Sequence, residues 1–179
     1  ADGGEPPPPP ADAIEALRTA LVHVQPLAQG SNRLWIDFAA VAPTIDDARA
    51  RTLLLPLAEQ TSELSLARCA VTDAFLADLV RFPRLARLDL RATGIGDAGL
   101  AELASHAALM ELVLVETKLS DAAVDVLLAL PALERTYLWH SGVSSAGLAR
   151  LRAERPGLEV LAGDEPAAAV VEAEGALAF

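Results

Sequence analysis

A repeat of 24 residues constrains this chain more than any other feature of its sequence. Successive segments from residue 61 to residue 148 align at this step without a gap. One aligned column contains Leu64, Leu88, Leu112 and Thr136, the next contains Leu66, Leu90, Leu114 and Leu138, and a third contains Cys69, Thr93, Thr117 and Ser141. Such a period is typical of stacked supersecondary units that cannot bury their apolar sides alone. The sequence therefore predicts a solenoid.

Each unit has the same internal order, a short strand followed by a helix. The strands are expected at residues 63–66, 87–90, 111–114 and 135–138, and leucines at helical spacing follow each of them. Asp73, Asp97, Asp121 and Ser144 or Ser145 are expected to cap the helices. The predicted fold class is α/β, a solenoid with short parallel strands on its concave face and helices on its convex face.

We expect four regions along the chain. Residues 1–10 form a proline-rich linker, 11–60 an N-terminal cap with a degenerate first repeat, 61–162 the repeats, and 163–179 an acidic, alanine-rich tail. Five consecutive prolines favour a polyproline II spacer. Such a spacer leads to an anchor, another domain or a partner subunit, or is a bare terminus. The tail is either loose or docked as a cap.

Inside the cap, residues 11–21 are expected to form a helix capped by Asp12, followed by strands at 22–27 and 34–38 and a helix at 44–57. After Pro156, Leu158 and Leu161 are expected to take the first two leucine positions of a fifth unit.

The column of Cys69 and its small polar counterparts lies where the chain leaves each strand. Backbone groups are buried there without strand partners, and a small polar side chain can satisfy them. Cys69 is therefore interpreted as structural. Thr136 stands in a leucine column, and it is expected to weaken the last interface between units.

Charge and composition exclude several classes of partner. Fourteen basic and 25 acidic residues give a net charge of −11, which disfavours nucleic acid and anionic membrane surfaces. No apolar run approaches the ~20 residues that span a bilayer. The single cysteine, Cys69, excludes an intrachain disulfide and a cysteine-cluster metal site.

No motif predicts catalysis, a metal or a cofactor. Gly94 to Gly99 spells G-x-G-x-x-G, but this stretch is in register with sister loops that lack the glycines. His23, His106 and His140 have no ligand spacing, and helix capping accounts for the aspartate column better than calcium does. A chance Ser-His-Asp set stays open, although nothing resembles a nucleophile elbow. We expect a protein that is not an enzyme.

The outward strand positions are the candidates for protein binding. Their polarity decreases toward the C-terminal end, where an exposed apolar cluster is expected. The candidate residues are Trp35, Arg91, Val113, Val115, Tyr137, Trp139 and His140. The alternative is that the tail folds back over this cluster. The column of Glu63, Arg87, Glu111 and Arg135 is interpreted as a solvated ladder of cross-strand pairs.

The repeats resemble bacterial leucine-rich repeats with the consensus L-x-x-L-x-L-x-x-T-x-V-T-D-x-G-L, related to the cysteine-containing and ribonuclease-inhibitor-like types. The match is closest at 85–99 and 133–147. Residues 13–38 resemble the entry to the repeat domain that follows a membrane-bound c-type cytochrome domain in planctomycete-type proteins. That resemblance implies a periplasmic location and a haem-bearing neighbour. The chain itself lacks C-x-x-C-H, so it cannot attach a c-type haem.

The expected function is a non-enzymatic protein-protein interaction or scaffold module, an accessory part of a larger bacterial membrane-associated assembly. The alternative is a regulatory or sensing segment of a cytochrome-linked electron-transfer protein. The expected partners are proteins, and a membrane complex or a haem-protein complex is the candidate partner. The expected location is the periplasm, for which Ala1-Asp2 would be the N-terminus after leader removal. The cytoplasm is the alternative.

Overall fold

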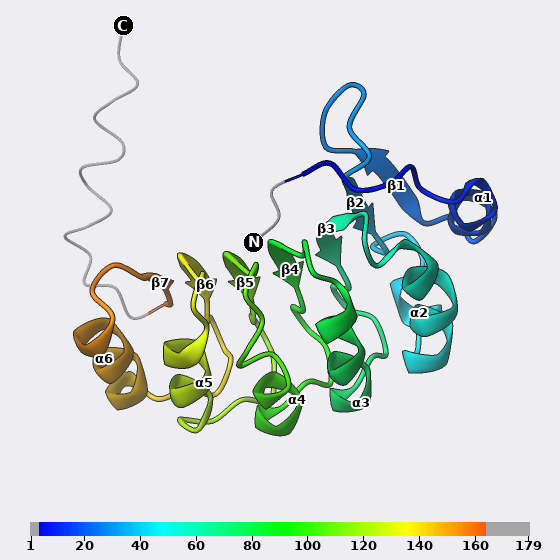
Figure 1. Cartoon of the computed structure of the whole chain (residues 1–179). Coiled ribbons are helices and arrows are strands. Elements are labelled where there is room, and N and C mark those ends of the chain that lie inside the picture. Colours follow the sequence, from blue (N-terminus) through cyan, green and yellow to red (C-terminus); the bar gives the residue numbers. More distant parts are fainter. Residues whose placement is uncertain (1–3, 164–179) are drawn as a thin grey trace, which may run out of the picture.

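A computed structural model describes residues 4–163 of the chain. Within them, one sheet runs in the order β1 to β7, and helices cover one side of it in a curved stack (Figure 1). The strands are β1 His23–Pro26, β2 Leu34–Asp37, β3 Thr61–Ser65, β4 Arg87–Asp89, β5 Glu111–Val113, β6 Arg135–Tyr137 and β7 Glu159–Leu161. The α-helices are α1 Ala11–Thr19, α2 Asp47–Leu54, α3 Asp73–Leu76, α4 Asp97–Ala101, α5 Ala123–Ala129 and α6 Ser145–Glu154. Short 3-10 helices are η1 Ala42–Thr44, η2 Leu55–Leu57 and η3 Ala77–Arg81.

The parallel stacking predicted from the repeat is confirmed. Strands β2 to β7 pair in parallel, and β1 pairs antiparallel with β2. One register row joins Leu64, Leu88, Leu112, Thr136 and Val160. The expected register of the fifth unit is therefore wrong by one residue. Val160 occupies the leucine column and is buried, whereas Leu161 pairs with Tyr137 and is half-buried.

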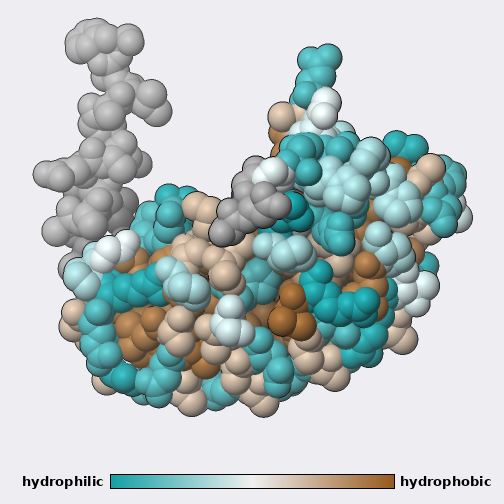
Figure 2. Space-filling view, viewed as in Figure 1, coloured by the Kyte–Doolittle hydropathy of each residue, from teal (hydrophilic) through white to brown (hydrophobic). Residues whose placement is uncertain are grey.

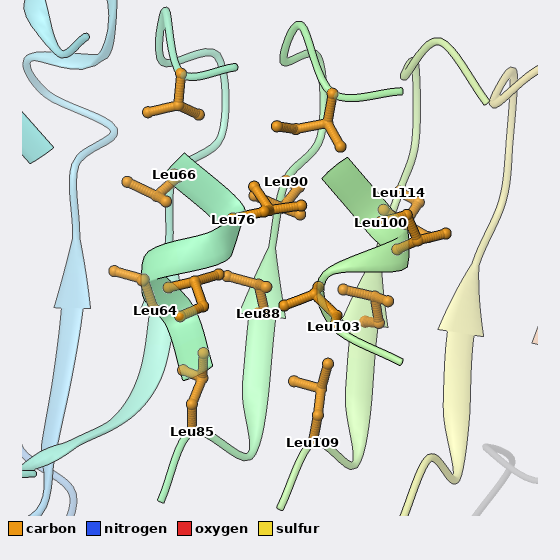
Figure 3. Close-up of a cluster of buried hydrophobic side chains, with 14 of the residues drawn as sticks. Leu64, Leu66, Leu76, Leu85, Leu88, Leu90, Leu100, Leu103, Leu109 and Leu114 are labelled. Carbon is orange, nitrogen blue, oxygen red and sulfur yellow. The ribbon is translucent and has the colours of Figure 1, made fainter. Parts of the chain in front are cut away.

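The core is a continuous row of aliphatic side chains between the sheet and the helices. Leu66, Leu90 and Leu114 are fully buried and stacked along the solenoid axis. Figure 3 shows the strand leucines meeting helix leucines such as Leu76 and Leu100 from the facing side. Burying one leucine is worth about 1.5–3 kcal/mol. Each coil therefore gains most of its stability from its two neighbours, as a stacked repeat requires.

The turns after β4 and β5 are built as the sequence predicts. Thr93 Oγ1 donates a hydrogen bond to the Leu90 carbonyl at 2.6 Å, and Thr117 Oγ1 donates to the Leu114 carbonyl at 2.8 Å. Cys69 occupies the same column and is buried. In each coil, the residue directly before this column adopts a left-handed backbone conformation. Its φ lies between 53° and 63° at Arg68, Ala92, Glu116 and His140. This turn releases the chain from the sheet toward the convex side.

The expected helix-capping role of the aspartate column is wrong. Thr72 caps α3, and the residues preceding α4 and α5 make no side-chain cap. The aspartates instead accept hydrogen bonds from the next coil. Asp73 accepts from the Gly96 N–H at 2.8 Å, Asp97 from the Ser120 N–H at 2.9 Å, and Asp121 from the Ser144 N–H at 2.7 Å. Ser144 caps α6, as predicted.

The N-terminal cap differs from expectation at its helix starts. Helix α1 begins at Ala11 without a side-chain cap, so Asp12 does not have the expected role. Helix α2 begins at Asp47, capped by Asp46, because residues 42–44 form the 3-10 helix η1 instead of the first helical turn. The two expected strands are present as β1 and β2.

The proline-rich segment lies against this cap instead of extending as a free spacer. Pro6 is buried, and its carbonyl accepts a hydrogen bond from Asn32 Nδ2 at 2.8 Å. The Pro7 carbonyl accepts from Gln60 Nε2 at 3.1 Å. Glu5 accepts from the Ser31 hydroxyl at 2.8 Å and from the Asn32 backbone N–H. The side chains of the β1–β2 loop and of Gln60 thus hold residues 5–7 in place. The division of the chain into four regions stays a prediction, and its tail lies outside the described residues.

Candidate protein-binding face

Two columns of side chains point outward from the concave side of the sheet. They alternate along each strand with the buried leucines. The first column contains Trp35, Glu63, Arg87, Glu111, Arg135 and Glu159, and the second contains Asp37, Ser65, Asp89, Val113, Tyr137 and Leu161. A third set, just beyond the strand ends, contains Ala39, Ala67, Arg91, Val115, Trp139 and Gly163. In the second and third sets, charge gives way to apolar groups toward the C-terminal end.

The first column forms a ladder of ion pairs, as predicted. Arg87 lies 3.1 Å from Glu111, and Arg135 lies 3.5 Å from Glu111 and 2.6 Å from Glu159. The neighbouring carboxylates, Glu159 foremost, raise the pKa of Arg135. Arg87, Arg135 and Glu159 are about half exposed, so solvent screening leaves these pairs weak. Their main effect is to order long side chains along one rim of the concave face.

Arg91 is engaged within its own coil. Its Nη2 lies 2.6 Å and its Nε lies 2.9 Å from Asp89 Oδ2, and the Arg91 backbone N–H donates to Asp89 Oδ1. Asp89 is buried and Arg91 is about half exposed. The hydrogen bonds that Arg91 donates to Asp89 raise the pKa of Arg91. This closed pair stiffens the middle of the concave face.

Trp35 lies at the N-terminal end of the same face. Its ring contacts His23 edge-on, with ring centroids 4.9 Å apart and an interplanar angle of 63°. Trp35 also lines a hollow of about 710 Å³ together with Asp37, Glu63, Arg68, Arg87 and Arg91. Figure 2 shows that the surface of the N-terminal cap is mainly hydrophilic and that hydrophobic side chains are visible on the flank of the repeats.

Tyr137 and Trp139 form an aromatic pair at the C-terminal end. Their ring centroids lie 5.8 Å apart with an interplanar angle of 33°, and both residues are half-buried. Trp139 packs against Gly163, where an added Cβ would lie 2.9 Å from the indole Cδ1. Val115 is half-buried, and His140 is exposed. His140 and Trp139 also line a smaller hollow of about 340 Å³.

The expected exposure of Val113 is wrong. Its side chain is 5% exposed, although it points to the concave side. It lies between Asp89 and Tyr137 in the sheet register. Side chains converge on the concave side of a curved sheet, so a small residue between two larger ones is covered. The structure thus brings Val115, Tyr137, Trp139 and His140 together at one end. It places Arg91 in the middle of the face and Trp35 at the other end.

Three groups with chemical potential, the Cys69 thiol, the His106 imidazole and the Gly96 N–H, are held in structural roles. Burial raises the pKa of the Cys69 thiol to about 12, so the thiolate is not populated near neutral pH. His106 is buried, its Nε2 lies 3.1 Å from the Phe82 carbonyl oxygen, and burial lowers its pKa. In the G-x-G-x-x-G stretch, the Gly96 N–H donates to Asp73 and is not available to a phosphate.

No group of three or more His, Cys, Asp or Glu residues within 4–163 has an arrangement that could hold a metal ion. In the same part of the chain, no helix combines the length and the apolar character needed to cross a membrane.

Two features of the face are not predicted by the sequence pattern. Arg68 and Glu116 also reach the larger hollow, because the left-handed turn places them beside it. Glycine or asparagine directly before the Cys/Thr column would have indicated a left-handed turn. In these coils that position contains neither residue. The second feature is that Glu63 is left out of the ion-pair ladder. The side chain of Arg87 pairs with Glu111 and not with Glu63, and the alternation of charges in the sequence does not predict this choice.

No family model and no curated protein sequence matches this chain. Among solved structures, an internalin from Listeria monocytogenes is similar, with 21% sequence identity and a TM-score of 0.49. The similarity covers 63% of this chain and 32% of that structure, so the chain spans about a third of its length. The parallel strand register, the aliphatic row and the convex helices described above define the architecture. The fold is a leucine-rich repeat solenoid.

Proposed function

We propose that this chain is a non-enzymatic protein-binding module that docks its partner on the concave face. One observation carries the proposal. The second and third sets of outward side chains change from Asp37, Asp89 and Arg91 to Val115, Tyr137 and Trp139. The last three are half-buried, with apolar area left open to solvent. Tyrosine and tryptophan are favoured anchors because they bury large apolar area and keep a polar handle.

The rest of the face supports this role. The Arg87–Glu111–Arg135–Glu159 ladder and the Asp89–Arg91 pair order the side chains beside the aromatic pair, which lowers the entropy lost on docking. The proposed contact set is Trp35, Arg91, Val115, Tyr137, Trp139 and His140, with Val113 behind it. A periplasmic location, membership of a membrane-associated assembly and a haem-protein partner are proposals that rest on the sequence resemblance.

Affinity capture from the native host tests the proposal. The wild-type chain, a Tyr137→Ala/Trp139→Ala variant and a Val80→Ala control would be compared by quantitative mass spectrometry. Val80 lies in η3 and is 67% exposed, so its truncation removes apolar surface away from the concave face. We expect the aromatic variant to lose its partner at unchanged thermal stability and the control to retain it. Equal capture by all three proteins would refute the proposal.

A further inference from the structure

The ion-pair ladder on the concave face ends one cation short. Its column alternates Glu63, Arg87, Glu111, Arg135 and Glu159, which is three carboxylates against two guanidiniums. Arg87 pairs with Glu111, and Arg135 pairs with both Glu111 and Glu159. Within residues 4–163, Glu63 takes part in no ion pair, and continued alternation would require a cation at the next position, which Trp35 occupies.

Trp35 and Glu63 are direct neighbours across the β2–β3 pair. Parallel strands lie about 4.8 Å apart, so one cation can reach both the indole face and the carboxylate. The edge-on contact with His23 fixes the indole at the rim of the hollow. Asp37, also on β2, adds a second carboxylate to this hollow and makes no ion pair in the described part of the chain.

The charge balance of the hollow favours a positive occupant. Arg87 and Arg91 line it but are engaged by Glu111 and Asp89. Among the lining residues that the structure describes, the carboxylates without an ion pair are Asp37, Glu63 and Glu116, and the guanidinium without one is Arg68. Three unpaired carboxylates thus face one unpaired guanidinium, and the complete lining carries one net negative charge. The net charge of −11 attracts the same kind of partner over longer range.

We propose that the hollow binds an arginine side chain of the protein partner, which lies over Trp35 and pairs with Glu63 and Asp37. An arginine guanidinium suits this site better than a lysine ammonium, because its plane stacks on the indole while its N–H groups pair with carboxylates. The inference rests on the proposed protein-binding function and adds the chemistry of a second contact, at the opposite end of the concave face from Tyr137 and Trp139.

The test uses the isolated full chain and a capped peptide, acetyl-Gly-Arg-Gly-amide, titrated at low salt. The readout is the indole N–H resonance of each tryptophan by NMR, assigned with Trp35→Phe. We expect a saturable shift of the Trp35 signal, no shift of the Trp139 signal, and weaker binding of the lysine analogue. Glu63→Gln and Asp37→Asn should each weaken binding by up to about fivefold. Asp12→Asn changes the net charge equally on exposed α1 and should leave binding unchanged.

Several results would overturn the inference. They are the absence of a saturable Trp35 shift, an equal shift of Trp139, equal or tighter binding of the lysine peptide, or equal affinities for Glu63→Gln, Asp12→Asn and wild type. Because no natural partner enters this titration, its failure leaves the capture experiment with Tyr137 and Trp139 untouched. Failure of that capture experiment would likewise leave the peptide titration interpretable.

Discussion

The carboxylate of Asp97 accepts two hydrogen bonds from Ser120 in the following coil, from its backbone N–H at 2.9 Å and from its hydroxyl at 2.6 Å. Asp121 and Ser144 repeat this arrangement one coil later, at 2.7 Å for both contacts. Asp47 and Thr72 form the same pair at the start of the array. A ladder of aspartates on one edge of the solenoid therefore joins each coil to the next, where the leucine row alone would leave backbone N–H groups unsatisfied.

Replacing Asp97 by alanine should destabilise the fold by about 1 kcal/mol, because the Ser120 N–H and hydroxyl lose a charged acceptor at a partly solvated site. Urea unfolding followed by circular dichroism measures this change. Asp12→Ala is the matched control, since Asp12 is exposed and caps no helix. Equal unfolding midpoints for the two variants would show that the aspartate ladder contributes nothing to stability.

Gly99→Ala should cost about 1–3 kcal/mol by overpacking. An added Cβ would lie 2.4 Å from Asp73 Oδ1 and 2.8 Å from the Asp73 Cα, so the carboxylate that holds Gly96 would have to move. Gly157→Ala is the control, because no atom lies within 4 Å of its added Cβ. Thermal unfolding should show a lower midpoint for Gly99→Ala and an unchanged or higher one for Gly157→Ala; the reverse order would contradict the packing described here.

Thr136→Val should stabilise the protein by about 1 kcal/mol. Thr136 is fully buried between Leu112 and Val160, and within the described residues its hydroxyl oxygen has no hydrogen-bond partner. Valine has the same shape without the desolvated hydroxyl. Thr117→Val removes a hydroxyl that donates to the Leu114 carbonyl, and should therefore destabilise by about 1 kcal/mol. Chemical denaturation of both variants distinguishes the two threonines, and a loss of stability in Thr136→Val would refute this assignment.

His106 should make stability fall in mild acid. Burial lowers its pKa below the ordinary value of 6.5, so the folded protein binds a proton less readily than the unfolded chain. The contribution of neutral His106 is complete above pH 6.5 and is lost as the pH falls through the lowered pKa. Unfolding free energies between pH 5 and pH 8 should slope downward in acid for wild type and less steeply for His106→Gln. A wild-type slope in His106→Gln would contradict this role.

The fold follows from the sequence because one constraint acts at every coil. The aligned leucines can be buried only if the strands stack in parallel, and Leu64, Leu88 and Leu112 do so in one register row. The function of Asp97 was harder to infer. An aspartate at a helix start suits both a cap and a hydrogen bond to the next coil, and only the distance to Ser120 decides between them.

The sequence predicts where the candidate face lies, but it does not predict how exposed each side chain on that face is. Alternation within the strands places Tyr137 and Trp139 outward, but it carries no information on curvature, which covers Val113. The unpaired state of Glu63 depends on the direction in which Arg87 turns, and a column of alternating charges looks the same either way. Which of two glutamates an arginine pairs with depends on the packing around its side chain in the folded protein.

Hydroxyl-radical footprinting of the chain alone and in its native complex tests the concave-face account most directly. The account predicts that oxidation of Tyr137 and Trp139 falls sharply in the complex, while Leu21 and Val80, which are 73% and 67% exposed away from this face, keep their reactivity. Unchanged oxidation of both aromatic residues, with protection at Val80 on the convex side, would contradict it.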